Sequence, residues 1–422
     1  MKKKDIAEND DRVVKVNSRC YHWPSRPVVV VCIDGCSPAY LEMGLETGGM
    51  PNLARFQREG FCEQAKGVIP SFTNPNNLSI VTGTPPSMHG ISGNYYLDPK
   101  TGAEVMMNDP RLLRCETILA EFARENARVA VITAKDKLLC LLSHHLPGGI
   151  RFSAEKADRC SFRENGIEGV LSMVGMDLPN VYSAELSYLV LRAGVKILER
   201  YGSDLMCLSL IDYLQHKHAP GSREANEFYR LLDREWGRLA DLGAVVALTA
   251  DHGMNDKSNP DGSPKVIYLQ ELLDQKFAKE SCRVICPITD PYVVHHGSLG
   301  SFVTVFCFDR DILEKVMDFI VTLDGVERVF SRREASMEFE LPPDRIGDLS
   351  VLADAATVIG TSPQNHDLSA LGNFPLRSHG GLAEQTVPFI LSRPLKFPYA
   401  SRVRPERLRN FDIFDYAINR TL

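Results

Sequence analysis

Short apolar runs recur along the chain, and each ends at a polar residue or a glycine. Four of them show no alternation of apolar and polar positions, at residues 27–35, 128–134, 205–210 and 245–250. Runs of this kind predict strands buried on both faces, as in a parallel sheet covered by helices. Apolar positions at helical spacing, with a glycine at or just beyond the end, occur at residues 51–60, 186–200 and 222–242. We therefore expect an α/β fold whose core sheet is mostly parallel and flanked by helices.

The pattern changes after residue 256. Residues 257–375 combine a loop rich in proline and glycine, the short alternating run at 302–308 and one helix near 311–323. The earlier pattern returns with an apolar run at 387–392. We predict a core formed by residues 20–256 and 376–422, interrupted by a smaller α+β cap insertion at 257–375.

Composition excludes several classes of protein. A formal net charge of -6, with 44% hydrophobic and 24% charged residues, is typical of a globular protein and does not indicate a nucleic-acid partner. No apolar segment resembles a signal peptide or a membrane span. Eleven cysteines without a C-x-x-C pair indicate reduced thiols and a cytoplasmic location. Cys36, close to Asp34, is the one cysteine for which both a chemical role and simple packing stay open.

Metal-binding residue types follow the predicted strands. Five segments carry them: Asp34; Thr73; Asp212 with His216; Asp251 with His252; and His379. Each residue alone is a weak signal, since an aspartate at a strand end is as often a helix cap. The carboxyl ends of parallel strands meet at one sheet edge, so together they predict a shared site. Mixed imidazole and carboxylate ligands favour Zn²⁺, or less often Mn²⁺ or Fe²⁺.

These residues resemble the two-metal site of the alkaline phosphatase superfamily, in its nucleotide pyrophosphatase/phosphodiesterase branch. The resemblance implies one zinc ion on Asp212, His216 and His379. A second ion would bind Asp34, Asp251, His252 and the oxygen of Thr73. By the same resemblance, Thr73 is the nucleophile and Asn94 binds a phosphoryl oxygen.

Longer segments resemble one family within this branch, the phosphonoacetate hydrolases. These segments are SFTNPNNLSIVTG (71–83), VITAKDKL (131–138), FSAEKAD (152–158), DYLQHKHAPG (212–221), ITDPYVVHHGSLGS (288–301) and LRSHGG (376–381). They span nearly the whole chain beyond about the first 20 residues.

Two lysines distinguish this chemistry from ester hydrolysis. Lys135 and Lys137 are two residues apart at the end of an apolar run, which we interpret as extended, so both point to the same side and Asp136 points away. A P–C bond breaks only if the departing carbanion is delocalised. Two ammonium groups on a substrate carboxylate would stabilise the enediolate that forms. On an ordinary surface strand the same pair would simply be solvated.

The expected function is therefore a di-zinc hydrolase that cleaves phosphonoacetate to acetate and phosphate through a phosphorylated Thr73. The main alternative is a phosphodiesterase or phosphomonoesterase of the same superfamily. A protein that binds or senses phosphonates without turnover is a second alternative. We expect a small-molecule phosphonate as the partner, neither nucleic acid nor a membrane, and allow for a homodimer.

Overall fold

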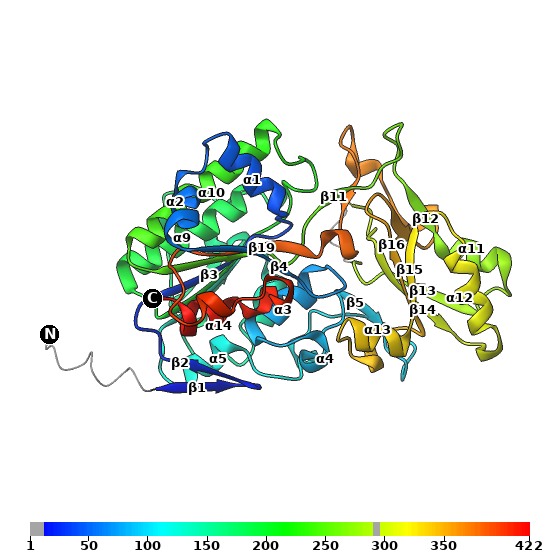
Figure 1. Cartoon of the computed structure of the whole chain (residues 1–422), viewed down its shortest axis with the longest axis horizontal. Helices are drawn as coiled ribbons and strands as arrows, with labels where there is room; N and C mark the ends of the chain where they lie inside the picture. The colour runs from blue at the N-terminus through cyan, green and yellow to red at the C-terminus, as the bar shows by residue number, and fades with distance from the viewer. Residues whose placement is uncertain (1–11, 290–295) are drawn as a thin grey trace, which may run out of the picture.

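A seven-stranded sheet forms the core of the computed structural model, which describes residues 12–289 and 296–422 (Figure 1). Its strand order is β4-β19-β10-β3-β9-β7-β8. The bounds are β3 Val28–Cys32, β4 Phe61–Lys66, β7 Val129–Thr133, β8 Ile150–Ser153, β9 Leu205–Ser209, β10 Val245–Thr249 and β19 Thr386–Leu391. The strands from β10 to β8 pair in parallel, whereas β19 is antiparallel to both β10 and β4. The expected mostly parallel sheet is confirmed.

Helices cover both faces of this sheet. α1 (Pro38–Glu46), α2 (Pro51–Glu59), α9 (Glu185–Tyr201) and α10 (Arg223–Asp241) pack on one face, and α3 (Thr73–Thr82), α5 (Ile118–Arg124) and α14 (Ile413–Asp415) lie on the other (Figure 1). Strands β3, β7, β9 and β10 are consequently buried at every position. Burial on both faces explains why their sequences do not alternate. Shorter helices are α4 (Pro86–His89), α6 (Asp136–Leu142), α7 (Phe162–Asn165) and α8 (Val170–Val174).

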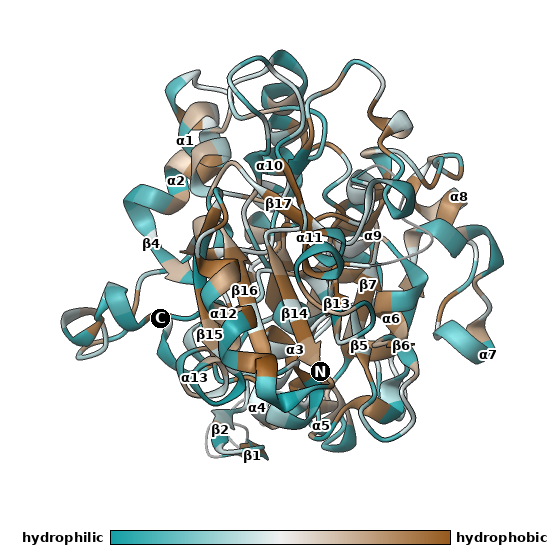
Figure 2. Ribbon diagram, turned by 90° about the vertical axis from the view of Figure 1, so that its right-hand side faces the viewer, coloured by the Kyte–Doolittle hydropathy of each residue, from teal (hydrophilic) through white to brown (hydrophobic). Residues whose placement is uncertain are grey.

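A second sheet lies beside the core, on the right of Figure 1, with its own apolar cluster. It is antiparallel, in the order β13-β14-β16-β15, with bounds Cys282–Ile285, Phe302–Cys307, Leu349–Ala353 and Val326–Ser331. Helices α11 (Leu269–Lys276), α12 (Leu313–Val321) and α13 (Arg332–Glu338) accompany it. Figure 2 shows β14 and β16 as largely hydrophobic strands. The division of the chain into a core and a cap at residues 257–375 stays a prediction.

Four two-stranded sheets complete the fold among the described residues. They are β1–β2 (Val13–Val16, Arg19–His22), β5–β6 (Tyr95–Leu97, Glu104–Met106), β11–β18 (Asn255–Asp256, Arg377–Ser378) and β12–β17 (Val266–Tyr268, Val358–Gly360). Within the described ranges, every helix is too short or too polar to cross a membrane.

A fully buried ion pair joins the two sheets. The Lys257 ammonium lies 2.8 Å from Glu384 Oε1 and donates to the Ala355 carbonyl at 2.9 Å, and both charged side chains are completely buried. Asn255 and the backbone N–H of Gly381 also donate to Glu384. The backbone carbonyl of Glu384 accepts from Gly253, directly after His252. The pair therefore fixes residues 253–257 against the end of the second sheet.

Replacing only one member of this pair should destabilise the protein. Lys257→Ala leaves the Glu384 carboxylate buried without its cation, which costs about 3–5 kcal/mol of unfolding free energy. The midpoint of urea unfolding measures this loss. Lys279→Ala, at an exposed lysine, is the control and should change stability by no more than about 0.5 kcal/mol. The double variant Lys257→Met/Glu384→Leu should recover most of the loss, and equal midpoints for Lys257→Ala and the native chain would refute this role.

Candidate active site

The sheet topology brings the predicted ligands to one edge. Asp34 follows β3, Asp212 follows β9, and Asp251 and His252 follow β10, so all lie beyond the carboxyl ends of parallel strands. β19 runs in the opposite direction and therefore begins at this edge. His379, a few residues before β19, arrives there for that reason.

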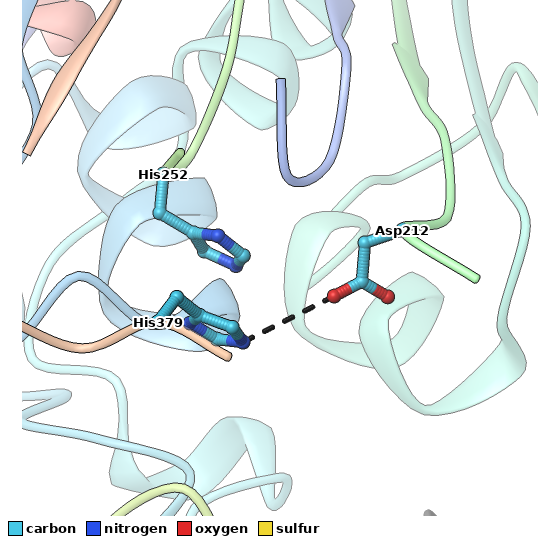
Figure 3. Close-up of side chains that lie close together, drawn as sticks. All are labelled: Asp212, His252 and His379. Carbon is cyan, nitrogen blue, oxygen red and sulfur yellow. Dashed lines mark ion pairs between the residues drawn. The ribbon is translucent and has the colours of Figure 1, made fainter. Parts of the chain in front are cut away.

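Asp212 is the centre of one group of side chains. Its Oδ2 lies 2.8 Å from Nε2 of His216 and 4.0 Å from Nε2 of His379. Asp212 and His216 are joined by one helical turn, since His216 N–H donates to the Asp212 carbonyl. The rings of His379 and His252 stack with centroids 3.5 Å apart, and Figure 3 shows both facing the Asp212 carboxylate.

His252 also belongs to a second group. Its Nε2 lies 3.3 Å from Asp34 Oδ1, 3.7 Å from Asp251 Oδ2 and 3.5 Å from Thr73 Oγ1. Ligand atoms of Asp34, Asp251 and His252 lie within 4.8 Å of one another, as do those of Asp212, His252 and His379. The described residues thus contain two adjoining candidate metal sites, and all seven predicted ligands lie in or beside them.

Each imidazole is oriented by a backbone carbonyl. Nδ1 of His216 lies 2.7 Å from the Arg377 carbonyl, and Nδ1 of His379 lies 2.7 Å from the Ser71 carbonyl. In His252 the partner of Nδ1, at 2.9 Å, is the carbonyl of Gly253. A carbonyl can only accept, so each Nδ1 carries a hydrogen, and the Nε2 atom of each ring is the one that faces the site and would bind a metal. This arrangement is typical of metal-bound histidine.

The resulting contacts require a positive charge between acceptors. The lone pair of His216 Nε2 faces a carboxylate oxygen of Asp212, and that of His252 faces Asp34 Oδ1, which is buried without a hydrogen-bond partner. Such pairs repel unless a proton or a cation lies between them. The imidazole and carboxylate donors therefore fit two divalent cations.

Titration behaviour supports the same conclusion. Burial, followed by the nearby carboxylates of Asp212 and Asp251, raises the pKa of Asp34 well above its usual value. Burial, and then His252, lowers the pKa of His379 well below its usual value. A raised pKa favours the protonated form of the Asp34 carboxyl, whereas a bound cation would favour its ionised form.

Two glycines allow the ligands to approach one another. Gly35 has φ +70°, and a Cβ there would lie 2.9 Å from Cβ of Asp212. Gly380 has φ +127°, and its Cβ would meet the Phe72 ring at 2.6 Å. Any other residue at either position would strain the backbone and displace the strand-end loops.

Thr73 is the first residue of α3, so its hydroxyl lies at the positive end of a ten-residue helix. The polar segment at 71–77 therefore contains the start of α3. Two of its asparagines hold neighbouring groups in place. Asn76 bonds the Val68 backbone, and Asn77 goes further by donating to Asp251 Oδ2 at 3.0 Å.

A cavity of about 100 Å³ opens beside these groups. Its lining comprises Asp34, Thr73, Asn74, Asn94, Met106, Asn108, Lys135, Lys137, Leu138, Leu210, Ile211, Asp212, His216, Ile288, His296 and His379. Oδ1 of Asn94 accepts from the Asn74 backbone N–H at 3.1 Å, so its NH₂ group remains available to a ligand.

The two lysines reach this cavity by a different route from the one predicted. Strand β7 ends at Thr133 and Lys135 is still extended, but α6 begins at Asp136, so the interpretation of Asp136 and Lys137 as extended was wrong. The leucines at 138, 139, 141 and 142 are buried and form one face of a helix. Their packing favours a helix here over the extended conformation that we expected. Asp136 does point away, toward Lys156.

Met106 at the end of β6, Asn108 two residues later and Ile288 after β13 line the cavity but had no recognisable signal in the sequence. For the pair His295 and His296 the sequence left open a place at the entrance of the site or on the surface, and His296 lines the cavity. The ring of His296 stacks on that of His216 with centroids 5.1 Å apart. These segments lack apolar periodicity, so only the folded chain reveals their position. His295 lies outside the described residues.

Two other side chains have no role in the cavity. Cys36 is fully buried, and burial raises the pKa of its thiol to about 12, so it is a packing residue. His218 contacts the Phe374 ring, with centroids 5.5 Å apart, and does not line the cavity.

Comparisons with known proteins agree with this geometry. Residues 28–382 match the family described as type I phosphodiesterase / nucleotide pyrophosphatase. A crystal structure of phosphonoacetate hydrolase from Sinorhizobium meliloti 1021 in complex with phosphonoformate is 51% identical, with a TM-score of 0.92, covering 96% of this chain and 98% of that one. The same enzyme in complex with phosphonoacetate is 50% identical over the same shares, also with a TM-score of 0.92.

More distant or shorter relatives are similar as well. A phosphonoacetate hydrolase sequence from Penicillium oxalicum is 41% identical over 73 residues, which cover 17% of this chain and 90% of that sequence. Murine ectonucleotide pyrophosphatase / phosphodiesterase 5 is 17% identical over 94% of this chain and 96% of its own, with a TM-score of 0.63, and shares the fold.

The expected alkaline-phosphatase-like core is thus confirmed, and so is the resemblance to phosphonoacetate hydrolases. The chain belongs to the type I phosphodiesterase / nucleotide pyrophosphatase family.

Proposed function

We propose that this protein hydrolyses the carbon–phosphorus bond of phosphonoacetate, giving acetate and phosphate. The observation that carries the proposal is the composition of the cavity. A nucleophile candidate, two lysines and four of the metal-ligand candidates (Asp34, Asp212, His216 and His379) line a single space of about 100 Å³, and Asp251 and His252 lie buried directly beside Asp34. Ligand pockets for larger molecules measure about 300–1,000 Å³. A small dianionic phosphonate suits this space better than a nucleotide does.

Two divalent cations, for which zinc is our choice, would be held by Asp212, His216 and His379 and by Asp34, Asp251, His252 and the Thr73 oxygen. When bound, they would supply positive charge that lowers the pKa of the attacking hydroxyl and neutralises the phosphonate oxygens. Imidazole and carboxylate donors together favour zinc over magnesium or calcium.

Thr73 would act as the nucleophile. Thr73 is the first residue of α3, so a phosphonate bound to it would lie at a helix N-terminus, where backbone N–H groups and the helix dipole favour anions. The NH₂ group of Asn94 would donate to a phosphoryl oxygen. Attack by Thr73 Oγ1 on phosphorus forms a P–O bond and breaks the P–C bond, and the electron pair passes to the departing carbon.

Lys135 and Lys137 would bind the substrate carboxylate. As the P–C bond breaks, the carbanion is delocalised onto that carboxylate as an enediolate, whose added negative charge two nearby ammonium groups stabilise more than they stabilise the ground state. The Thr73 hydroxyl releases its proton to solvent on attack, and the departing carbon takes up one proton from solvent to give acetate. Water attacks the phosphorylated Thr73, releasing phosphate and restoring the hydroxyl.

Chelation should abolish turnover reversibly. Phosphate and acetate would be followed by ³¹P and ¹H NMR with phosphonoacetate as substrate, before chelation, after chelation and after adding zinc. We expect equal amounts of both products, complete loss in the apoprotein and recovery with about two zinc ions per chain. Zinc-loaded protein that cleaves a nitrophenyl nucleotide ester but not phosphonoacetate would contradict the proposal in favour of a phosphodiesterase.

Thr73→Ala should eliminate catalysis while retaining metal binding. The other six ligands remain, so zinc content should stay near two per chain whereas kcat falls by at least about 10³-fold. Thr73→Ser keeps a hydroxyl and serves as the matched control, which should retain measurable turnover. A protein that only binds phosphonates would show no turnover in any form, and wild-type rates in Thr73→Ala would exclude the assigned nucleophile.

Replacing Lys135 or Lys137 should impair cleavage of phosphonoacetate, whose carboxylate they would bind, without affecting metal binding. Lys135→Ala or Lys137→Ala should reduce kcat/KM for phosphonoacetate by about 10²-fold or more, because a hydrogen-bonded charge partner of the developing anion is removed. Zinc content should not change. Lys156→Ala is the control, since Lys156 is exposed, pairs with Asp136 and does not line the cavity. Equal kinetics for all three variants would refute the carboxylate role.

A further inference from the structure

The cavity is lined by apolar side chains, called here the apolar wall, as well as by the polar groups described above. Met106, Leu138, Leu210, Ile211 and Ile288 line it but can bind neither a cation nor an anion. Such a wall limits what can enter, because an added methylene that does not fit costs about 10- to 200-fold in discrimination. A residue that sets the size limit for substrates is therefore expected among these five.

Met106 is the apolar cavity residue that comes from the β5–β6 hairpin. It ends β6 of the β5–β6 hairpin and pairs with Tyr95. The next residue, Met107, is fully buried, whereas Asn108 lines the cavity again. Residues 107 and 108 form a turn after β6, and this turn brings Asn108 back to the cavity beside Met106.

The hairpin is attached firmly to the catalytic helix. The Asn74 side chain, beside Thr73, donates to the Met107 carbonyl at 3.0 Å, and Met107 N–H donates to the Asn94 carbonyl at 2.8 Å. Asn94 in turn donates from its backbone to the Pro287 carbonyl at 2.8 Å. The segment carrying Met106 is therefore fixed relative to the nucleophile candidate.

The second sheet supports the hairpin from behind. Leu97 packs with Ile285 and Phe306 in one buried cluster, and Glu104 forms an ion pair with Arg283 of β13. Ile288, shortly after β13, is 2% exposed and lines the same cavity. The hairpin and this connection therefore both contribute to the cavity wall, and the backbone that carries Met106 is held from both sides.

We propose that Met106 is a specificity-determining residue that limits the substrate to phosphonates with an unbranched, acetate-sized leaving group. The inference rests on the proposed function and names the feature that sets its substrate range. Larger groups on the carbon next to phosphorus would collide with Met106, while the carboxylate and the phosphonate would still find their partners.

The test compares two substrates with the same leaving-group chemistry and different sizes. These are phosphonoacetate and its 2-benzyl derivative, 3-phenyl-2-phosphonopropanoate, each assayed by phosphate release with the zinc-loaded full chain. Met106→Ala should raise the kcat/KM ratio of benzyl derivative to phosphonoacetate by at least tenfold. Met106→Trp should reduce phosphonoacetate turnover by at least tenfold with zinc content unchanged, because the larger side chain fills the cavity.

Two control variants separate the effect of side-chain size at residue 106 from a general effect of substitution on the enzyme. Met106→Leu conserves volume and should keep the native ratio, and Met337→Ala, at a methionine that is 72% exposed on α13, should also keep it. An unchanged ratio in an active Met106→Ala variant would overturn this inference and leave the proposed function intact. No phosphate from phosphonoacetate with the native chain would overturn the proposed function, and this inference with it.

Discussion

The structure depends on a cluster of imidazole and carboxylate side chains whose ligand atoms converge on one small space. Three imidazole lone pairs and three buried or half-buried carboxylates meet at one sheet edge, and every Nδ1 is committed to a backbone carbonyl. Such a cluster is stable only with added positive charge. Much of the surrounding fold supplies the backbone carbonyls and close approaches that hold it in place.

The sheet and its connections explain how distant segments reach this point. Parallel strands deliver Asp34, Asp212 and Asp251 from one direction, and the reversal of β19 delivers His379 from the other. The second sheet contributes through the backbone, since Ser301 N–H donates to the His379 carbonyl at 2.9 Å. It therefore supports the ligand cluster as well as the cavity wall, and the two sheets act together on one site.

The buried strands, and the residues that follow them, could be predicted from the sequence because both depend on local patterns of apolar and polar residues. A run such as 245–249 is buried on both faces, and the residues after it can only lie at the edge. Longer-range features were not predictable in this way. Lys137 lies in a helix because the leucines after it pack as one face, and Met106 reaches the cavity through a hairpin that another sheet supports. Asn77 orients Asp251 across 174 residues of sequence, a contact that no local pattern encodes.

Anomalous X-ray scattering at the zinc edge, from crystals of the zinc-loaded protein, tests the central claim most directly. The account predicts two peaks per chain. One should be bonded to Asp212, His216 and His379, and the other to Asp34, Thr73, Asp251 and His252. A single peak, or peaks away from these side chains in fully loaded protein, would contradict the account.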